Sequence, residues 1–355
     1  MQTLSYGDVK AAVERVADHV RPVAIAPAEP VHPRDLRGDG GTGSLGGSDA
    51  TGVAAAPEAP GAPGAPGAPG APGASDYELF FALEFLQHTG SFKARGARNF
   101  LQAHRDAGTL PEAGVTIASG GNAGLACAWA AGQQGVRATV FLPETAPKVK
   151  VERLRGYGAD VRLVGSEYAE ALAACEAFAA ESGALASHAY DHPLIAAGAG
   201  TLVEEIHRRI PGLDTVVVSV GGGGLFAGVA TAAREHGIRT VAVEPENCRA
   251  LDAALAAGAP VDVTVESVAA DSLGARRVSA AALHAAGQDD VRTLLVPDAE
   301  IVRVRRALWA DHRLVVEHAA ATALAGLTAG GYRPGPGEKV CVVLCGANTD
   351  PTDLV

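Results

Sequence analysis

One lysine of the chain stands where an amine can do covalent chemistry. Lys93 lies in the run HTGSFKARG (residues 88–96), close to the expected start of a helix and in mostly uncharged company. Burial and the positive end of a helix both lower the pKa of a lysine, which leaves more free amine to attack an aldehyde. The alternative is a surface lysine at a helix start, and most lysines taken alone are of that kind.

A turn of small residues follows the apolar run VTIAS and opens an Ala-rich helix. It reads SGGNAG over residues 119–124, so Ser119, Gly120 and Gly121 let backbone N–H groups approach an anion at a helix N-terminus. A substrate carboxylate suits that position, and the amide of Asn122 can hydrogen-bond a ring hydroxyl. The alternative is an ordinary strand–helix turn with Asn122 as the helix cap.

Four consecutive glycines, Gly221, Gly222, Gly223 and Gly224, precede Leu225 between the run VVVSV and another expected helix. Such a run costs chain entropy, so a purely structural role is hard to defend. Backbone amides at this helix start would bind a phosphate. The run matches neither GxGxxG nor a Walker loop, which argues against dinucleotides and nucleoside triphosphates.

A cysteine ends the apolar strand KVCVVL near the C-terminus. Cys345 begins the tract CGAN, and a thiol at a strand end can hydrogen-bond a ring nitrogen while it stays neutral. The alternative is a small buried hydrophobe, the commonest fate of a free cysteine. Cys341, earlier in the same strand, keeps that simpler interpretation.

The elements that position these residues are predicted by alternation. From Asp76 onward, short β-branched runs (VTIAS, ATVFLP, DVRLVG, TVVVSV, RTVAVEP and KVCVVLCG) alternate with Ala-rich helical stretches. Nearly continuous apolar strands of this kind indicate parallel α/β sheets covered by helices on both faces. Ligands bind beyond the carboxyl ends of such strands, and the four motifs fall there.

Composition narrows the class of protein. The chain has 355 residues and a net charge of −11, which disfavours nucleic acid and anionic membranes as partners. It shows neither an apolar signal region nor an uncharged span, and its five cysteines are scattered, so we expect a soluble cytoplasmic protein with reduced thiols. Residues 33–75, rich in Gly, Pro and Ala, are expected to form a flexible insertion to which we assign no function.

Taken together, the motifs resemble the serine/threonine dehydratase group of fold-type II pyridoxal-phosphate (PLP) enzymes. The resemblance runs from about Tyr77 almost to the C-terminus, through EFLQHTGSFKARGA, SGGNAG, YDHPLIAAGAGTLVEEI, SVGGGGLFAG, VEHAAATALAGL and VVLCGAN. The tracts SVAADSLGA and LCGAN look closest to serine dehydratases. The resemblance implies two open α/β lobes with parallel sheets. The smaller lobe would be 114–192, carrying the carboxylate loop; 1–113 and 193–355 would form the larger, PLP-binding lobe of a homodimer.

Roles follow from the resemblance residue by residue. Lys93 matches the lysine that forms a Schiff base with PLP, and it would serve as the catalytic base. Asn122 matches the contact of the ring hydroxyl, Cys345 the partner of the pyridine nitrogen, and Glu317 a glutamate near the cofactor. The remaining matches are to the phosphate loop (Gly221, Gly222, Gly223, Gly224, Leu225) and to the substrate-carboxylate loop (Ser119, Gly120, Gly121, Asn122).

Several positions depart from the family pattern. The Gly/Pro/Ala insertion occupies much of the space of a first strand, Ala82 replaces a lysine, and His318 replaces a proline. Glu244 fits one cation ligand, but Ala250 stands where the aspartate would be, so we expect no metal. Gly120 stands where racemases of the family carry a serine, which argues against racemisation.

The expected activity is an ammonia-lyase reaction on a small amino-acid substrate. L-Serine and/or L-threonine would lose water by α,β-elimination and give pyruvate or 2-oxobutyrate plus ammonia. A neutral thiol at the ring nitrogen favours prompt loss of the β-group over a long-lived carbanion. Two alternatives stay open: β-replacement on the same scaffold, as in cysteine synthases, and a PLP-binding paralogue without catalytic activity.

Overall fold

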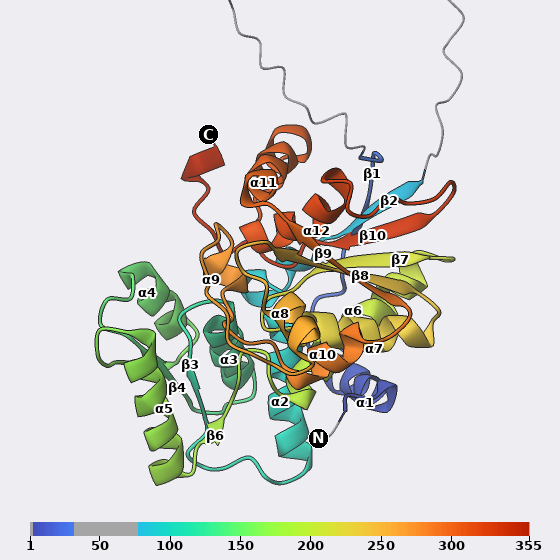
Figure 1. Cartoon of the computed structure of the whole chain (residues 1–355). Helices are drawn as coiled ribbons and strands as arrows, with labels where there is room; N and C mark the ends of the chain where they lie inside the picture. The colour runs from blue at the N-terminus through green and yellow to red at the C-terminus, as the bar shows by residue number, and fades with distance from the viewer. Residues whose placement is uncertain (1–2, 32–76, 355) are drawn as a thin grey trace, which may run out of the picture.

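The structure, a computed structural model, describes residues 3–31 and 77–354 (Figure 1). The expected Gly/Pro/Ala insertion lies outside the described residues. The first helix, α1 (Tyr6–Val16), begins at Ser5, whose hydroxyl accepts from the backbone N–H of Asp8 while the Asp8 carboxylate accepts from the N–H of Ser5. This reciprocal pair satisfies two N–H groups that a helix start leaves without partners.

The larger of two sheets has six strands in the order β1-β2-β10-β7-β8-β9. Its members are β1 (Ile25–Ala28), β2 (Glu78–Ala82), β7 (Thr215–Ser219), β8 (Arg239–Pro245), β9 (Val291–Val296) and β10 (Lys339–Val343). All neighbours are parallel except β1 and β2, which pair antiparallel with Ile25 opposite Ala82. The expectation that the insertion takes the place of a first strand is therefore wrong, because β1 is present and the insertion links it to β2.

The smaller sheet has four parallel strands in the order β5-β4-β3-β6. Its members are β3 (Val115–Ala118), β4 (Ala138–Leu142), β5 (Asp160–Leu163) and β6 (Leu185–Ala186), with helices α3 (Asn122–Gln133), α4 (Lys148–Gly156) and α5 (Tyr168–Ser182) around them. The expected α/β class with parallel sheets and flanking helices is confirmed. The lobe boundaries at 114 and 192 stay a prediction.

Helices cover the larger sheet from two sides, with α11 and α12 on one and α1, α6, α7 and α10 on the other (Figure 1). The bounds of the remaining helices are α2 (Lys93–Asp106), α6 (Pro193–Arg209), α7 (Gly224–Glu235), α8 (Ala250–Ala257), α9 (Ala270–Leu273), α10 (Ala280–Ala286), α11 (Asp298–His312) and α12 (His318–Thr328). Short 3-10 turns occur at η1 (Glu84–Leu86), η2 (His88–Gly90) and η3 (Thr352–Leu354).

Helix α2 lies between the two sheets and belongs to the packing of both. Phe100 and Leu101 on α2 are buried in the same apolar cluster as Val115 and Ile117 of β3. Another part of α2 touches α6, where the backbone carbonyl of Ile195 lies so close to Gly96 that a Cβ there would stand 2.7 Å from it. The residue at the start of α2 is therefore held by contacts from both halves of the molecule.

The cysteines are all free and buried, in line with the absence of any expected disulfide. Among the residues that the structure describes, no helix combines the length and the apolar character needed to cross a membrane.

Candidate active site

A cavity of about 550 Å³ lies at the carboxyl ends of strands from both sheets. Its walls come from the turns after β3, β4 and β7, from the start of α2, and from the segments before α12 and after β10. The expected site residues all line it: Lys93, Ser119, Gly120, Gly121, Asn122, Gly221, Gly222, Gly223, Gly224, Leu225, Glu317 and Cys345. The structure thus brings them together, while their individual roles stay predictions.

Lys93 is the first residue of α2 and projects into this cavity. Its Nζ donates a hydrogen bond to the backbone carbonyl of Ala189 at 2.7 Å. Burial lowers the pKa of Lys93 to about 8, against the opposing pull of Cys345 and Glu317. A sizeable fraction of the side chain is therefore uncharged amine near neutral pH, the form that attacks a carbonyl carbon.

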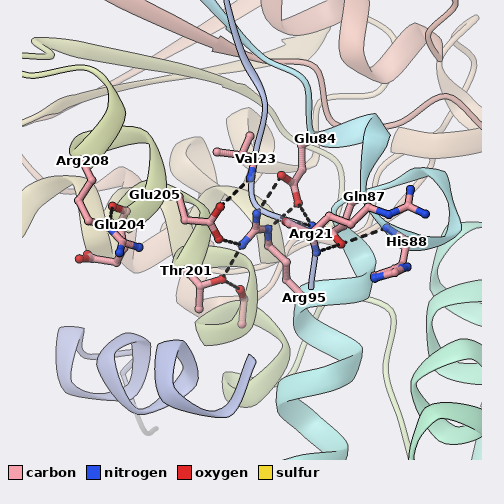
Figure 2. Close-up of polar contacts among 11 residues, drawn as sticks. Arg21, Val23, Glu84, Gln87, His88, Arg95, Thr201, Glu204, Glu205 and Arg208 are labelled. Carbon is pink, nitrogen blue, oxygen red and sulfur yellow. Dashed lines mark hydrogen bonds and ion pairs between the residues drawn. The ribbon is translucent and has the colours of Figure 1, made fainter. Parts of the chain in front are cut away.

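The start of α2 is supported by a buried ion-pair network around Arg95 (Figure 2). Arg95 binds both carboxylate oxygens of Glu84, at 2.5 and 3.2 Å, and Glu205 of α6 at 2.6 Å. The second oxygen of Glu205 accepts from the N–H of Val23, which ties the segment before β1 to the network. Burial alone would lower the pKa of Arg95, but the two carboxylates raise it overall, so the guanidinium stays charged.

The glycine run between β7 and α7 has a geometry that only glycine allows at two positions. Gly223, the N-cap of α7, has φ of +90°. A Cβ on Gly222 would lie 2.3 Å from the ring of Tyr190, so the loop and this ring share one closely packed space. The first N–H groups of a helix have no partner within it, so the start of α7 presents donors suited to a phosphate.

The SGGNAG turn opens α3, but its asparagine does not cap the helix. The N-cap is Gly121, and no side chain caps this helix end. The alternative interpretation of Asn122 as a cap is therefore wrong. Its Nδ2 instead donates to both carboxylate oxygens of Glu317, at 2.9 and 3.0 Å. At Gly120 a Cβ would lie 2.8 Å from Cδ2 of Leu142, so any larger residue would force Leu142 to move.

Two polar side chains close the end of the cavity where β7 and β10 finish side by side. The thiol of Cys345 lies 3.7 Å from the hydroxyl of Ser219 and is buried. Burial raises the pKa of Cys345 to about 12, and the nearby Glu317 adds to this rise. The thiol is therefore neutral, as the sequence predicts for a partner of a ring nitrogen.

Glu317 stands at the N-cap position of α12, with its carboxylate turned into the cavity wall. Besides the two bonds from Asn122, it accepts from the backbone N–H of Asn348 at 2.8 Å. Burial raises its pKa, although these hydrogen bonds oppose the rise. Gly346 leaves room for it, since a Cβ there would stand 2.9 Å from the carboxylate.

Four further cavity or network residues escape the prediction from sequence: Ala189, Tyr190, Ser219 and Asn348. They lie in or beside the tracts YDHP, VVVSV and CGAN, which do point to this region. Nothing in the spacing of these tracts shows that they meet.

The expected cation site does not fit a cation. Both carboxylate oxygens of Glu244 accept backbone N–H groups at the start of α8, from Leu251 at 2.8 Å and Asp252 at 2.9 Å. Burial raises the pKa of Glu244 to about 7, and Ala250 has no oxygen to offer. In the described part of the chain, no group of three or more His, Cys, Asp or Glu side chains is arranged to hold a metal ion.

Residues 67–346 match the family described as pyridoxal-phosphate dependent enzyme. The chain belongs to this family. An L-threonine ammonia-lyase of Geobacter sulfurreducens is 38% identical over 276 residues, which cover 77% of this chain and 67% of that protein. A serine dehydratase-like protein of Rattus norvegicus is 36% identical over 284 residues, which cover 76% and 85%.

Among solved structures, a pyridoxal 5'-phosphate-dependent aspartate racemase superposes with a TM-score of 0.78 at 26% identity. The match covers 100% of this chain and 99% of the racemase. The resemblance to the serine/threonine dehydratase group of fold-type II enzymes is confirmed, and PLP is the cofactor. The cavity fits this cofactor: it offers an amine of lowered pKa, a glycine turn at a helix start and a neutral thiol.

Proposed function

We propose that this PLP-dependent enzyme removes water from L-serine and/or L-threonine and releases pyruvate or 2-oxobutyrate plus ammonia. The observation that carries the proposal is the Lys93 amine. It lies in one cavity with two helix starts, α3 and α7, that suit a carboxylate and a phosphate respectively. The two dehydratase-type relatives support this reaction class.

Lys93 has two tasks in this proposal. It holds the cofactor through its amine, and after the substrate amine replaces it, it takes the proton from the substrate Cα as general base. A pKa of about 8 suits both tasks, because the free amine is well populated and still basic enough to take a proton. PLP, when bound, withdraws electrons from the substrate and so makes that proton acidic.

The remaining residues bind and orient. Ser119, Gly120 and Gly121 would hold the substrate carboxylate at the start of α3, which fixes the direction of the Cα–H bond. The glycines after β7 would bind the cofactor phosphate, and Asn122 its ring hydroxyl. The neutral thiol of Cys345 would meet the ring nitrogen without charging it. The bond from Cβ to the hydroxyl breaks, water leaves, and the released enamine hydrolyses to the 2-oxo acid and ammonia.

Two observations bear on the alternatives. Gly120 carries no side chain that could donate a proton from the opposite face of the substrate, so it supports elimination over racemisation. β-Replacement differs from elimination only in the final acceptor, so it is a matter for product analysis. A homodimer and a cytoplasmic location are also part of the proposal, on the family resemblance and the five free thiols.

The test is an assay of the purified, PLP-loaded protein against a panel of β-hydroxy amino acids. Cofactor absorbance, ammonia and 2-oxo acid are followed together, with and without sulfide as a competing nucleophile. We expect stoichiometric ammonia and 2-oxo acid from serine or threonine, and none from Lys93→Ala. Normal turnover in Lys93→Ala, or a coloured protein without turnover on any substrate of the panel, contradicts the proposal.

A further inference from the structure

The segment after β10 runs beside the turn that leads into α2. The N–H of Phe92 donates to the carbonyl of Cys345 at 3.0 Å, and the N–H of Ala347 donates to the carbonyl of Gly90 at 3.0 Å. An isolated antiparallel bridge joins Ser91 to Gly346 between them. This pairing brings the next residue, Asn348, to the base of the cavity.

The polar groups of the Asn348 side chain are fully engaged there. Its Nδ2 donates to Oδ1 of Asn122 at 2.6 Å and to the carbonyl of Thr89 at 2.7 Å. Its Oδ1 accepts from Arg153 of α4 at 2.5 Å, while its backbone N–H donates to Glu317. One residue thus connects four segments that are far apart in the sequence.

These contacts decide which way the amide of Asn122 faces. An amide nitrogen only donates, so the atom of Asn122 that meets Nδ2 of Asn348 has to be its oxygen. The amide nitrogen of Asn122 then points to Glu317, which only accepts while it is ionised. A flipped Asn122 would set nitrogen against nitrogen and oxygen against carboxylate. Asn348 and Glu317 together therefore leave one favourable orientation.

The second donation of Asn348 supports the turn before Lys93. Thr89 has φ of +63°, a left-handed conformation that a β-branched residue rarely adopts. The carbonyl of this strained residue is the one that accepts from Asn348. At Gly90, φ is +78° and a Cβ would stand 2.9 Å from Oδ1 of Asn348, so the turn and the side chain fit closely.

The end of the chain is held in place by a buried arginine. Nε of Arg305 donates to the carbonyl of Val316, the residue before Glu317, at 2.8 Å. The same guanidinium binds the carbonyl of Asp350 at 3.1 Å and pairs with the carboxylate of Asp353. Arg305 therefore links the residues after Asn348 to the start of α12, which keeps Asn348 and Glu317 in register.

We propose that Asn348 is a positioning residue that fixes the amide of Asn122 and the turn leading to Lys93. It acts through these groups and need not touch the substrate. This inference rests on the proposed function in one respect, the role of Asn122 at the ring hydroxyl.

The experiment measures PLP affinity and the absorbance of the loaded protein in the absence of any substrate. In Asn348→Ala, Oδ1 of Asn122 and the carbonyl of Thr89 both lose a donor. We expect the dissociation constant of PLP to rise by about 10-fold or more, the cost of leaving a buried polar group without its partner. The pH at which the holoenzyme spectrum changes should shift as well.

The matched control is Arg153→Ala, which removes the contact on the oxygen of Asn348 and leaves both donations intact. We expect its PLP affinity to stay within about 3-fold of wild type. A double-mutant cycle with Asn122→Ala then separates positioning from bulk destabilisation, since residues that act through one another are not additive. In the Asn122→Ala background, the loss caused by Asn348→Ala should shrink to the part transmitted through Thr89.

The outcomes separate cleanly. Asn348→Ala with wild-type PLP affinity and an unchanged spectral pH profile overturns the inference, as does full additivity in the cycle. A wild-type protein that binds no PLP contradicts the proposed function itself. Thermal unfolding of each apo protein shows whether the variants fold; if Asn348→Ala does not, Asn348→Asp keeps the shape but cannot donate to Asn122, and the same expectations apply to it.

Discussion

Two buried polar networks flank Lys93, and they are built from different chemistry. The network around Arg95 consists of full charges, with Arg95 and Glu84 side chains 0% exposed, and it lies behind the helix that carries Lys93 (Figure 2). The network around Asn348 joins neutral amides to a single carboxylate, Glu317, and borders the cavity. The charged network can lock a helix in place, whereas the amide network can present oriented donors and acceptors to a bound group.

The largest expected effect comes from breaking the charged network. Arg95→Ala leaves Glu84 and Glu205 buried without their cation, and we expect the free energy of unfolding to fall by about 3–5 kcal/mol. Urea unfolding of the apo protein measures it. The control is Arg277→Ala, which removes an exposed pair with Asp262 and should cost at most about 1 kcal/mol. Equal losses in the two variants would contradict the assigned role of Arg95.

A smaller effect is expected from the amide network. Glu317→Gln keeps the size of the side chain but replaces one acceptor with a donor, so it cannot satisfy Asn122 and Asn348 as the carboxylate does. We expect a loss of about 1–3 kcal/mol in unfolding free energy, with a clear fall in PLP affinity. The comparison with Arg95→Ala is informative: a larger stability loss in Glu317→Gln would reverse the distinction between the two networks.

The pH dependence of cofactor loading tests Lys93, which stands between the networks. Burial lowers its pKa to about 8, so the rate at which apo protein takes up PLP should rise with pH and reach half its maximum near that value. The unfolded lysine titrates near ~10.4, so between these values the unfolded chain binds more protons and apo stability should increase with pH. A midpoint for loading close to the unfolded value would show that the amine is solvated.

The smallest effect is expected from Cys345→Ser. A hydroxyl is neutral and can hydrogen-bond a ring nitrogen as the thiol does, and the pKa of about 12 shows that no thiolate charge is lost. We expect kcat to change by less than about 5-fold, because neutral hydrogen bonds differ by only about 1 kcal/mol. Steady-state kinetics with Cys345→Asp as the contrasting variant measures it, and a larger loss in the serine variant would point to a role for the thiol beyond hydrogen bonding.

Much of the fold and the membership of the site followed from local patterns. Apolar runs predicted β3, β4, β5, β7, β8 and β10, and placing the motifs at their carboxyl ends was enough to gather the expected residues around one cavity. β1 was missed because its sequence, IAPA, has a proline and little β-branched character.

The networks were beyond reach for a physical reason. Arg95 and Glu205 are 110 positions apart, and Asn348 and Asn122 are 226 apart. Contacts of that separation are set by how α2, α3, α6 and the C-terminal segment pack, and no periodicity in one segment reports the position of another. The assignment of Asn122 as a cap failed in the same way, since a tertiary partner, Glu317, outcompeted the local backbone.

The antiparallel pairing of β1 with β2 has an evolutionary consequence. Ala28 faces Leu79, so the connection between the two strands leaves and re-enters the sheet at neighbouring points on its edge. The entropic cost of closing such a connection grows only with the logarithm of its length. Natural variation can therefore lengthen or trim this link freely, while the distance from its far end to Lys93 stays the same.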